Sequence, residues 1–229
     1  FPLSGAGLDQ LAAQWNAGLL KRRDEEFACE GIDWNAEEQS RWRNDVFPAH
    51  LAGWRGLPET PGDGQAFALD NASLSRGDAA CLWTAISELK PTRLMEVGCG
   101  WSTRLIRAAI NARNLPCEVI AIDPDPRVEI DEVVDAHLDQ PVQEVPLADF
   151  EMLKAGEMLV LDTTHVAFPG GEVLHLFQRV VPRLNEGVVV GVHGVRLPHE
   201  YHRGERSQGF TEQALLQTYL AYNARAEIL

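Results

Sequence analysis

The sequence predicts an α/β protein with a doubly wound, mainly parallel sheet and a helical N-terminal extension. From residue 93 onward, apolar strand-like runs alternate with segments of helical periodicity, which is the order that right-handed crossovers between parallel strands require. The run 94–97 also leads through a glycine turn, Gly98-Cys99-Gly100, into an apolar helical stripe. A strand, a glycine turn and a helix in this order are typical of sheets that bind a nucleotide-like ligand at a strand end.

Length and composition limit the class of protein. A chain of 229 residues, of which 45% are hydrophobic, is long enough for one domain with an extension or for two small domains. No apolar run reaches the roughly 18 residues that a membrane span needs. The net charge of -14 repels phosphate backbones and anionic lipids. We therefore expect no nucleic acid and no membrane among the partners.

Cysteine usage and the N-terminal residues favour a cytoplasmic enzyme of bacterial type. The four cysteines are scattered, without a C-x-x-C pair or a histidine at zinc spacing, so we expect reduced thiols. Residues 1–7 are too short and too uncharged for a signal peptide. The first residue is not Met, and the sequence leaves open whether the chain is a fragment of a longer protein.

The chain divides into a helical extension with a linker, residues 1–65, and a second domain, residues 66–229. An apolar stripe with basic residues after it predicts a first helix over 8–20. Residues 57–73 are rich in Pro, Gly, Asp and Asn, which indicates a loop or linker. We expect this linker to separate the extension from the catalytic core.

A second helix of the extension is predicted over 36–54. Asn35 with Glu38 three residues later has the spacing of a capping box, and Pro48 is expected to break or kink the helix. Two of its tryptophans, Trp42 and Trp54, either line a substrate pocket or anchor the extension on the core, and we favour the anchor because large aromatics mostly pack. The helices of the extension could equally bury a homodimer interface, because they carry Trp15, Trp34, Trp42 and Trp54.

The second domain begins with a helix, which Ser75 and Asp78 cap and which ends at Lys90-Pro91. Strands are then recognised by short apolar runs, and helices by apolar residues at helical spacing. The predicted strands are 93–97, 118–122, 141–145, 157–162 and 187–193. The predicted helices are 103–113, 127–137, 170–184 and 211–222.

The glycine turn bears on the kind of cofactor. Gly98 and Gly100 let the backbone turn tightly and approach a ligand, because no Cβ stands in the way. The dinucleotide fingerprint G-x-G-x-x-G lacks its third glycine here. With Glu96 two residues ahead, the stretch resembles the first motif of class I S-adenosylmethionine-dependent methyltransferases, E/D-x-G-x-G-x-G, with Ser102 in place of the last glycine. The resemblance implies S-adenosyl-L-methionine as cofactor, with four residues at its site: Glu96, Gly98, Gly100 and Ser102.

Two further acids are candidate cofactor ligands. Asp123 ends the second predicted strand, where a carboxylate can accept hydrogen bonds from both ribose hydroxyls of a nucleoside. NAD sites use the same device, so Asp123 does not separate the two cofactors. The third predicted strand carries Gln143 and Glu144, where methyltransferases read the adenine edge. Either could fill this role, and Glu144 is our candidate.

The ends of the last two strands narrow the resemblance. The fourth strand runs into Asp162-Thr163-Thr164-His165-Val166 and the fifth into His193-Gly194-Val195. These resemble a bacterial subgroup, methyltransferase domain 24, whose strands run into Asp-Ser-Ser-His-Val and His-Asp-Ile. The resemblance covers residues 66–229 and implies a Rossmann-like class I methyltransferase fold. Gly194 stands where this subgroup has aspartate, and the missing carboxylate puts a metal site or an acid-assisted step there in doubt.

Methyl transfer from S-adenosylmethionine is an in-line displacement that needs alignment more than covalent help from the protein. A hydroxyl acceptor must still lose its proton, and His165 and His193, at adjacent strand ends, are the candidate bases. Asp162 would orient the acceptor or stabilise the sulfonium charge. These three residues could also hold a metal, but the resemblance does not require one and we predict none. We expect O-methylation of a small or carbohydrate-like hydroxyl acceptor.

Two other functions stay open. Gly194 and Ser102 are compatible with a catalytically inactive binding or scaffold protein that keeps the fold. An NAD-dependent oxidoreductase is less favoured, because hydride transfer would require a proton relay such as a Tyr-x-x-x-Lys pair. The tyrosines without a lysine at that spacing are Tyr201, Tyr219 and Tyr222.

Overall fold

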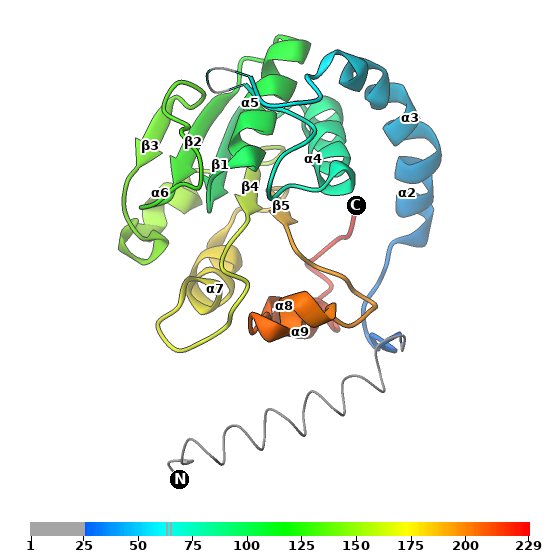
Figure 1. The fold of residues 1–229 in the computed structure, drawn as a ribbon. Coiled ribbons are helices and arrows are strands. Elements are labelled where there is room, and N and C mark those ends of the chain that lie inside the picture. Colours follow the sequence, from blue (N-terminus) through cyan, green and yellow to red (C-terminus); the bar gives the residue numbers. More distant parts are fainter. Residues whose placement is uncertain (1–25, 63, 65) are drawn as a thin grey trace.

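The computed structural model describes residues 26–62, 64 and 66–229. Within this part of the chain, five strands form one parallel sheet in the order β3-β2-β1-β4-β5 (Figure 1). Because the chain leaves β1 toward β2 and β3 and then returns to its other side for β4 and β5, the sheet is doubly wound, as predicted. The strands are β1 Arg93–Val97, β2 Glu118–Ile122, β3 Ala136–Leu138, β4 Met158–Leu161 and β5 Val189–Val192.

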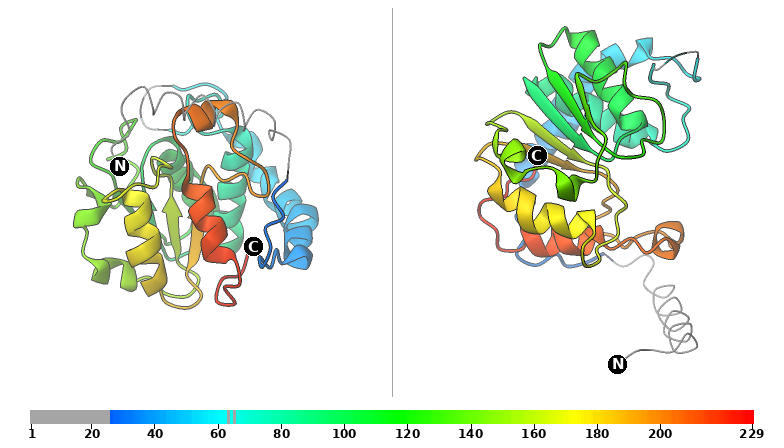
Figure 2. Two further views of the ribbon diagram at one scale, coloured as in Figure 1. Left: turned by 90° about the horizontal axis from the view of Figure 1, so that it is seen from below. Right: turned by 90° about the vertical axis from the view of Figure 1, so that its left-hand side faces the viewer.

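Helices cover both faces of this sheet, so the fold is Rossmann-like (Figure 2). On one face lie α4 Arg76–Leu89 and α5 Trp101–Arg113. On the other lie α6 Leu147–Glu151 and α7 Glu172–His175, which continues through a π-helical turn, Leu176–Val180, and a 3-10 turn, Val181–Arg183.

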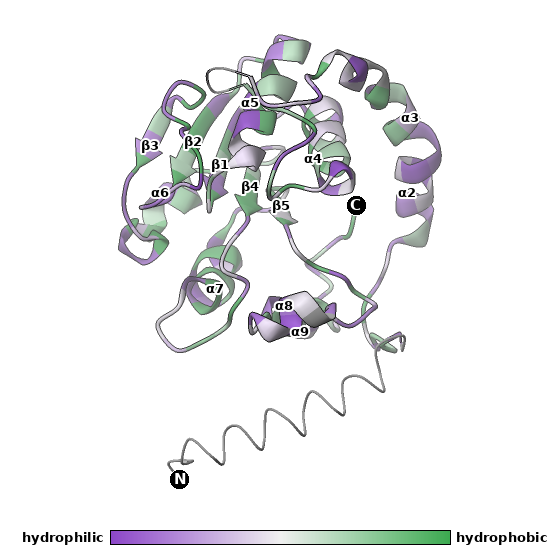
Figure 3. Cartoon of the chain, viewed as in Figure 1, coloured by the Kyte–Doolittle hydropathy of each residue, from purple (hydrophilic) through white to green (hydrophobic). Residues whose placement is uncertain are grey.

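The central strands are apolar on both faces, because each face is covered. Leu94 of β1 packs with Trp83 and Ile106 in one buried cluster, whereas its neighbour Met95 packs with Phe150 in a second cluster across the sheet. Figure 3 shows the resulting hydrophobic colouring of β4, compared with the mostly hydrophilic α8. This two-sided burial explains why the strands are continuous apolar runs rather than alternating patterns.

The third strand and the helix before it were predicted wrongly. The segment 141–145 is a 3-10 turn, Val142–Glu144, because Pro141 and Pro146 bracket it and proline cannot donate to a sheet ladder. The segment 127–137 is irregular and ends in β3 instead of forming a helix. Asp135 directs this pairing, since its carboxylate accepts a hydrogen bond from Val119 N and its own N–H donates to Val119 O.

The described extension is one helical rod with changing hydrogen-bond patterns. It consists of α2 Ala36–Arg41, a π-helical turn Trp42–Val46, α3 Phe47–His50 and a 3-10 helix Leu51–Gly56. Pro48 does not end the rod, since it lies in the first turn of α3, where its missing N–H is tolerated after the wider π turn.

The capping box predicted at Asn35 does not form. Asn35 has φ of 47° and makes no side-chain cap. Its side-chain amide instead donates to Glu227 Oε1 and to the Ile228 carbonyl. A long-range contact therefore takes the place of the local one.

The segment after the rod packs on the core although its composition predicts a loop. Phe67, Ala68 and Leu69 belong to the apolar cluster of α4 and α5. Trp54 packs edge-on against Trp83, with ring centroids 6.0 Å apart, which is the anchoring role that we favoured. The helix predicted over 8–20 lies outside the described residues, and the boundary near residue 65 stays a prediction.

The last helices, α8 Arg203–Ser207 and α9 Glu212–Leu220, follow β5 and lie beyond the ends of β4 and β5 in Figure 1. α9 also packs against the turn that continues α7, where Phe177 and Tyr219 meet edge-on. Among the described residues, no helix has the length and apolar character needed to cross a membrane.

Candidate active site at the carboxyl ends of the strands

The glycine turn is held between three strands. Gly98 N donates to Ile122 O at 3.1 Å, and Asp162 N donates to Val97 O at 2.9 Å. Gly98 has φ of 80°, and a Cβ on it would lie 1.9 Å from Asp162 O. Only glycine fits this position, because both the backbone conformation and the neighbouring carbonyl exclude a side chain.

Asp123 lies against this turn. Its Oδ2 accepts a hydrogen bond from Cys99 N at 2.6 Å, and its Oδ1 accepts one from Asp125 N at 2.8 Å. Both oxygens keep further lone pairs toward a cavity of about 340 Å³, which also touches Gly98, Gly100 and Gln143. We call this the turn cavity.

Three of the predicted cofactor residues do not line the turn cavity. Glu96 is 0% exposed beneath the turn, and burial raises its pKa to about 8, so the carboxyl group is largely protonated at neutral pH. Ser102 is buried on the first turn of α5 and faces a second cavity. Glu144 is also absent from the lining, whereas Gln143 is present, because the expected strand is a 3-10 turn that presents its residues differently.

The structure brings the three predicted catalytic residues together. His193 Nδ1 lies 2.9 Å from Asp162 Oδ1, and His165 Nε2 lies 3.5 Å from the same oxygen. His165 and His193 follow β4 and β5, which are neighbours in the sheet. Asp162 thus stands between two imidazoles at the carboxyl edge of the sheet.

Glu212 holds the far side of His165, and the sequence did not reveal it. Its Oε2 lies 2.7 Å from His165 Nδ1, and the residue is 0% exposed. The His165 carbonyl accepts hydrogen bonds from the backbone N–H groups of Thr211 and Glu212, at 2.8 and 3.1 Å. The start of α9 therefore fixes both the backbone and the ring of His165. No local pattern in the sequence indicates this contact.

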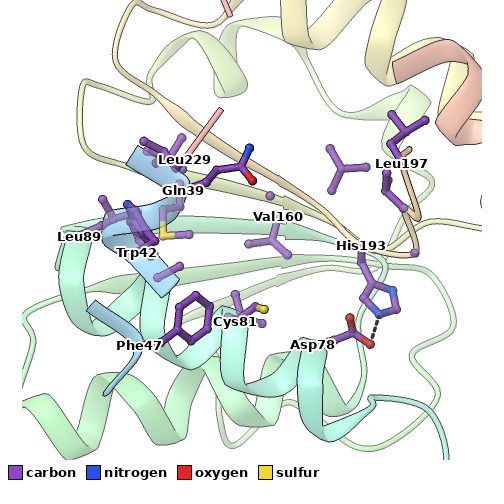
Figure 4. Close-up of a pocket in the computed structure, with 18 of the residues that line it drawn as sticks. Gln39, Trp42, Phe47, Asp78, Cys81, Leu89, Val160, His193, Leu197 and Leu229 are labelled. Atoms are coloured by element: carbon purple, nitrogen blue, oxygen red, sulfur yellow. Dashed lines mark ion pairs between the residues drawn. The ribbon is translucent and has the colours of Figure 1, made fainter. Parts of the chain in front are cut away.

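Asp78 holds His193 in a similar way. Asp78 Oδ2 lies 3.5 Å from His193 Nε2, and a dashed line marks this ion pair in Figure 4. The sequence indicated only a capping role for Asp78, and its N–H does donate to Ser75 Oγ at 3.2 Å. Ser75 thus caps α4 at the N–H of Asp78, and the side chain of Asp78 reaches the site, because the first turn of α4 lies at the carboxyl edge of the sheet.

The carboxylates make both histidines cationic at neutral pH. Burial lowers the pKa of His165, but Asp162 and Glu212 outweigh it and raise the pKa to about 9. Burial also lowers the pKa of His193, but Asp162 and Asp78 outweigh it and raise the pKa to about 10. Burial alone would raise the pKa of Asp162, yet the two imidazoles hold it well below its usual range. The cluster is therefore a set of mutually stabilising charges.

A second and larger cavity, of about 1040 Å³, opens beside the cluster. It lies between α4, the adjacent strands β4 and β5, and the helical rod of the extension, and Asp162 lines both cavities. Trp42, which we expected to anchor the extension, lines this cavity as well as packing against Phe47. We call it the long cavity.

Comparison with known proteins finds one family model that matches part of the chain. Residues 95–195 match the family model described as a methyltransferase domain. The chain therefore contains a methyltransferase domain. The match does not support the NAD-dependent oxidoreductase considered from the sequence.

Two solved structures resemble the chain at low identity. One, titled "cmcI-N160 SAH", is 16% identical, covers 61% of this chain and 74% of its own, and has a TM-score of 0.37. The other, the SAH-bound methyltransferase PaMTH1 of Podospora anserina, is 13% identical, covers 85% and 88%, and has a TM-score of 0.43. We draw no argument from likenesses this distant. No curated protein sequence matches the chain.

The turn cavity of the methyltransferase fits the chemistry of a nucleoside-bearing cofactor. A carboxylate, Asp123, is available for ribose hydroxyls, and the side-chain oxygen of Gln143 is available for a base edge, while its amide nitrogen donates to the Gly170 carbonyl at 3.1 Å. Ile122, Pro124 and Val142 supply apolar surface for a flat ring. A volume of about 340 Å³ is within the range of small-ligand pockets.

Gly194 has a structural explanation in this methyltransferase. It has φ of 70°, and a Cβ on it would lie 2.7 Å from His165 Cε1. An aspartate at this position would therefore collide with His165 in its present place. Glu212 and Asp78 supply carboxylates to the two imidazoles instead.

The cluster also has the composition of a metal site. Asp162, His165 and His193 each offer one ligand atom, and these atoms all lie within 4.8 Å of one another. A metal ion would have to displace a proton from each of the two cationic histidines, because only deprotonated groups bind metals. Our prediction that the enzyme needs no metal stays a prediction.

Proposed function

We propose that this methyltransferase transfers a methyl group to the hydroxyl oxygen of a small-molecule or carbohydrate acceptor held next to Asp162 and His193. One observation carries the proposal: Asp162 lines both the turn cavity and the long cavity. A cofactor in the first cavity and an acceptor in the second would meet at this carboxylate. Reactants held in line at such a junction need little further catalysis.

The cofactor residues follow from the lining of the turn cavity. In this proposal Asp123 accepts hydrogen bonds from the ribose, Gly98 and Gly100 let the backbone approach the cofactor, and Gln143 takes the role first given to Glu144. Glu96 supports the turn from below. Neither Glu144 nor Ser102 lines the turn cavity, and we assign them no contact with the cofactor.

The reaction requires one proton to leave the acceptor. Bound S-adenosylmethionine supplies a methyl group on a positively charged sulfur. The acceptor oxygen bonds to the methyl carbon as the bond from that carbon to sulfur breaks, and the hydroxyl proton passes to Nε2 of a neutral His193. His193 is the better candidate of the two histidines, because its side chain is 25% exposed whereas that of His165 is 7% exposed.

The charges of the cluster fit this step. The Asp162 carboxylate stabilises a cationic sulfur and later the imidazolium of His193. His165, fixed by Glu212, keeps Asp162 ionised and in place. We therefore give His165 a positioning role and His193 the role of general base.

The first experiment is calorimetric titration of the protein with S-adenosylmethionine, with its demethylated product and with NAD. We expect micromolar binding of the first two and none of NAD. Asp123→Ala should abolish this binding, and Asp139→Ala, which removes an exposed acid outside the turn cavity, should leave it unchanged. Well-folded protein that binds none of the ligands would refute the proposal.

Turnover is tested separately with S-adenosylmethionine labelled on its methyl group and a panel of hydroxylated acceptors. Parallel reactions with a chelator and with added Mg²⁺ test the predicted independence from metal. Cofactor binding without turnover on any acceptor would favour the inactive binding or scaffold protein that the sequence left open. The homodimer that the sequence left open is tested by light scattering on the same protein.

A further inference from the structure

The long cavity bears on the class of acceptor, because its polar and apolar residues are separated in space. Figure 4 shows His193 and Asp78 at one end and Trp42, Leu89 and Leu229 at the other. The cofactor side of the cavity is thus charged, and the remainder is largely hydrophobic.

Most of the apolar wall comes from α4, from strands β4 and β5, and from the extension. The residues of α4 that line the cavity below Asp78 are Cys81, Leu82, Ala85 and Leu89. Those of the strands are Met158, Val160, Val189 and Gly191. Trp34, Trp42 and Phe47 come from the extension. These side chains can bury an apolar body but offer it almost no hydrogen bonds.

The extension contributes three polar residues to the lining, Gln39, Ser40 and Arg43. The Gln39 amide donates to the Trp34 carbonyl, so one donor of this side chain is already engaged. Arg43 is exposed to solvent. A ligand reaching this end would meet aromatic surface and water rather than a ready set of hydrogen-bond partners.

A carbohydrate suits such a cavity poorly. Each sugar hydroxyl that is buried without a partner costs about 1–3 kcal/mol. Apart from His193, Asp162 and Asp78, the lining offers few side-chain partners, namely Gln39, Ser40, Arg43 and Ser102. An apolar body gains about 0.8 kcal/mol for each CH₂ group removed from water. The cavity, at about 1040 Å³, is at the upper end of the range for small-molecule pockets, so an extended molecule fits.

We infer that the acceptor is an amphipathic molecule with one hydroxyl-bearing end and an extended apolar body, such as an alkyl-substituted phenol. Its hydroxyl lies at His193 and Asp162, and its body runs along α4 and β5 toward Trp42 and Leu89. This inference rests on the proposed function, and it replaces the carbohydrate with a lipophilic acceptor.

Gly191 offers a way to test where the body lies. It lines the cavity from β5, and a Cβ on it would meet only Val160 Cγ2, at 3.9 Å. A valine at this position therefore adds bulk to the cavity without a close contact or an unfavourable φ. Gly204 is the matched control, because a Cβ there meets nothing within 4 Å and it does not line the cavity.

The experiment is calorimetric titration of the full chain, in the presence of demethylated cofactor, with 4-hexylphenol, phenol and methyl glucoside. We expect 4-hexylphenol to bind at least about a hundredfold more tightly than phenol, given the gain per CH₂ group, and methyl glucoside to bind more weakly than 4-hexylphenol. Gly191→Val should weaken the binding of 4-hexylphenol at least about tenfold. Gly204→Val should leave it unchanged, and both variants should bind the cofactor normally.

The outcomes separate the two proposals. Methyl glucoside binding more tightly than 4-hexylphenol, or 4-hexylphenol binding unaltered by Gly191→Val, would overturn the lipophilic acceptor while cofactor binding still supports the methyl transfer. Failure of the cofactor to bind wild-type protein would overturn the proposed function itself. If Gly191→Val does not fold, Ala85→Leu on α4 fills the same cavity and is judged by the same criteria.

Discussion

His165 and Glu212 form a buried pair in which Nδ1 of the imidazole lies 2.7 Å from Oε2 of the carboxylate. The two residues belong to different parts of the fold: His165 follows β4, and Glu212 begins α9. The pair aims the other ring nitrogen, Nε2, toward Asp162. The orientation of an imidazole at the site is thus set by the last helix of the chain.

Replacing Glu212 tests this pair. Glu212→Gln keeps the size of the side chain but removes the charge, so the pKa of His165 should fall from about 9 toward its ordinary value. We expect a loss of about 1–3 kcal/mol in the free energy of unfolding at pH 7, because a buried charge-assisted hydrogen bond is weakened. NMR titration of the imidazole and urea denaturation measure the two effects. The exposed Glu186→Gln serves as control, and an unchanged His165 titration would contradict the role of Glu212.

Stability should fall at alkaline pH because of the two histidines. Their pKa values in the folded protein, about 9 for His165 and about 10 for His193, lie above the unfolded value of about 6.5. The stability that they add is therefore fully present below about pH 6.5 and lost as pH rises through 9 to 10. Glu96 likewise lowers the stability as pH rises, between the pKa of the unfolded chain and its raised pKa of about 8 in the folded protein.

Thermal denaturation between pH 6 and pH 10.5 measures this effect. Tm should decline across the upper half of the range. The double variant His165→Gln/His193→Gln should show a much shallower decline. Equal slopes in the two proteins would mean that the histidines are not held as cations by their carboxylates.

The rate of methyl transfer should rise with pH. A general base must be neutral, and the raised pKa of His193, about 10, leaves little neutral imidazole at pH 7. We expect kcat/KM to increase up to pH 9 or beyond on an acceptor that the enzyme accepts. His193→Asn should lower kcat by about 10²–10⁴-fold and abolish the increase. A flat profile in the wild-type enzyme would assign the proton to another group.

Gly98 and Gly100 should respond differently to alanine. A Cβ at Gly98 would lie 1.9 Å from Asp162 O, whereas one at Gly100 would meet Arg127 Cβ at an ordinary 3.7 Å. Gly98→Ala should cost about 3 kcal/mol or more, which lowers Tm by roughly 6–12 °C for a chain of this size. Gly100→Ala should change Tm by less than about 3 °C. Calorimetry of the two variants decides, and equal effects would refute the argument.

Gly194→Asp should not improve the enzyme, although the related subgroup has aspartate at this position. The φ of 70° and the contact with His165 should make the substitution cost about 1–3 kcal/mol. We expect lower Tm and a lower rate, measured by calorimetry and with labelled cofactor. A higher rate would mean that a carboxylate is missing from the site.

Much of the fold was predictable from local pattern. The bounds predicted for the first two strands, 93–97 and 118–122, agree with β1 and β2, because both strands are apolar on both faces and are punctuated by turn residues. The third strand failed because β3 has only three residues, Ala136–Leu138. So short a strand has no periodic pattern in the sequence. The residues 141–145, which we predicted as the strand, belong to a turn between prolines.

By itself, the sequence determined which residues reach the carboxyl edge of the sheet. Strand ends are local features, and parallel strands bring their ends to one edge, so Asp123, Asp162, His165 and His193 could be placed there without a structure. The same reasoning does not tell how deep a residue lies. Glu96 is adjacent to the turn in sequence, yet it is sealed beneath it.

Only the tertiary structure decided which partners these residues have. Glu212 and Asp78 reach the histidines from helices far away in the chain, and their contacts depend on how α9 and α4 pack against the sheet. The same packing sets the charge of the histidines and encloses the long cavity between α4, β5 and the extension. Periodicity is a local property of the chain, whereas burial and charge coupling arise when distant segments meet. The charge of the histidines and the cavity could therefore not be derived from the pattern of residues.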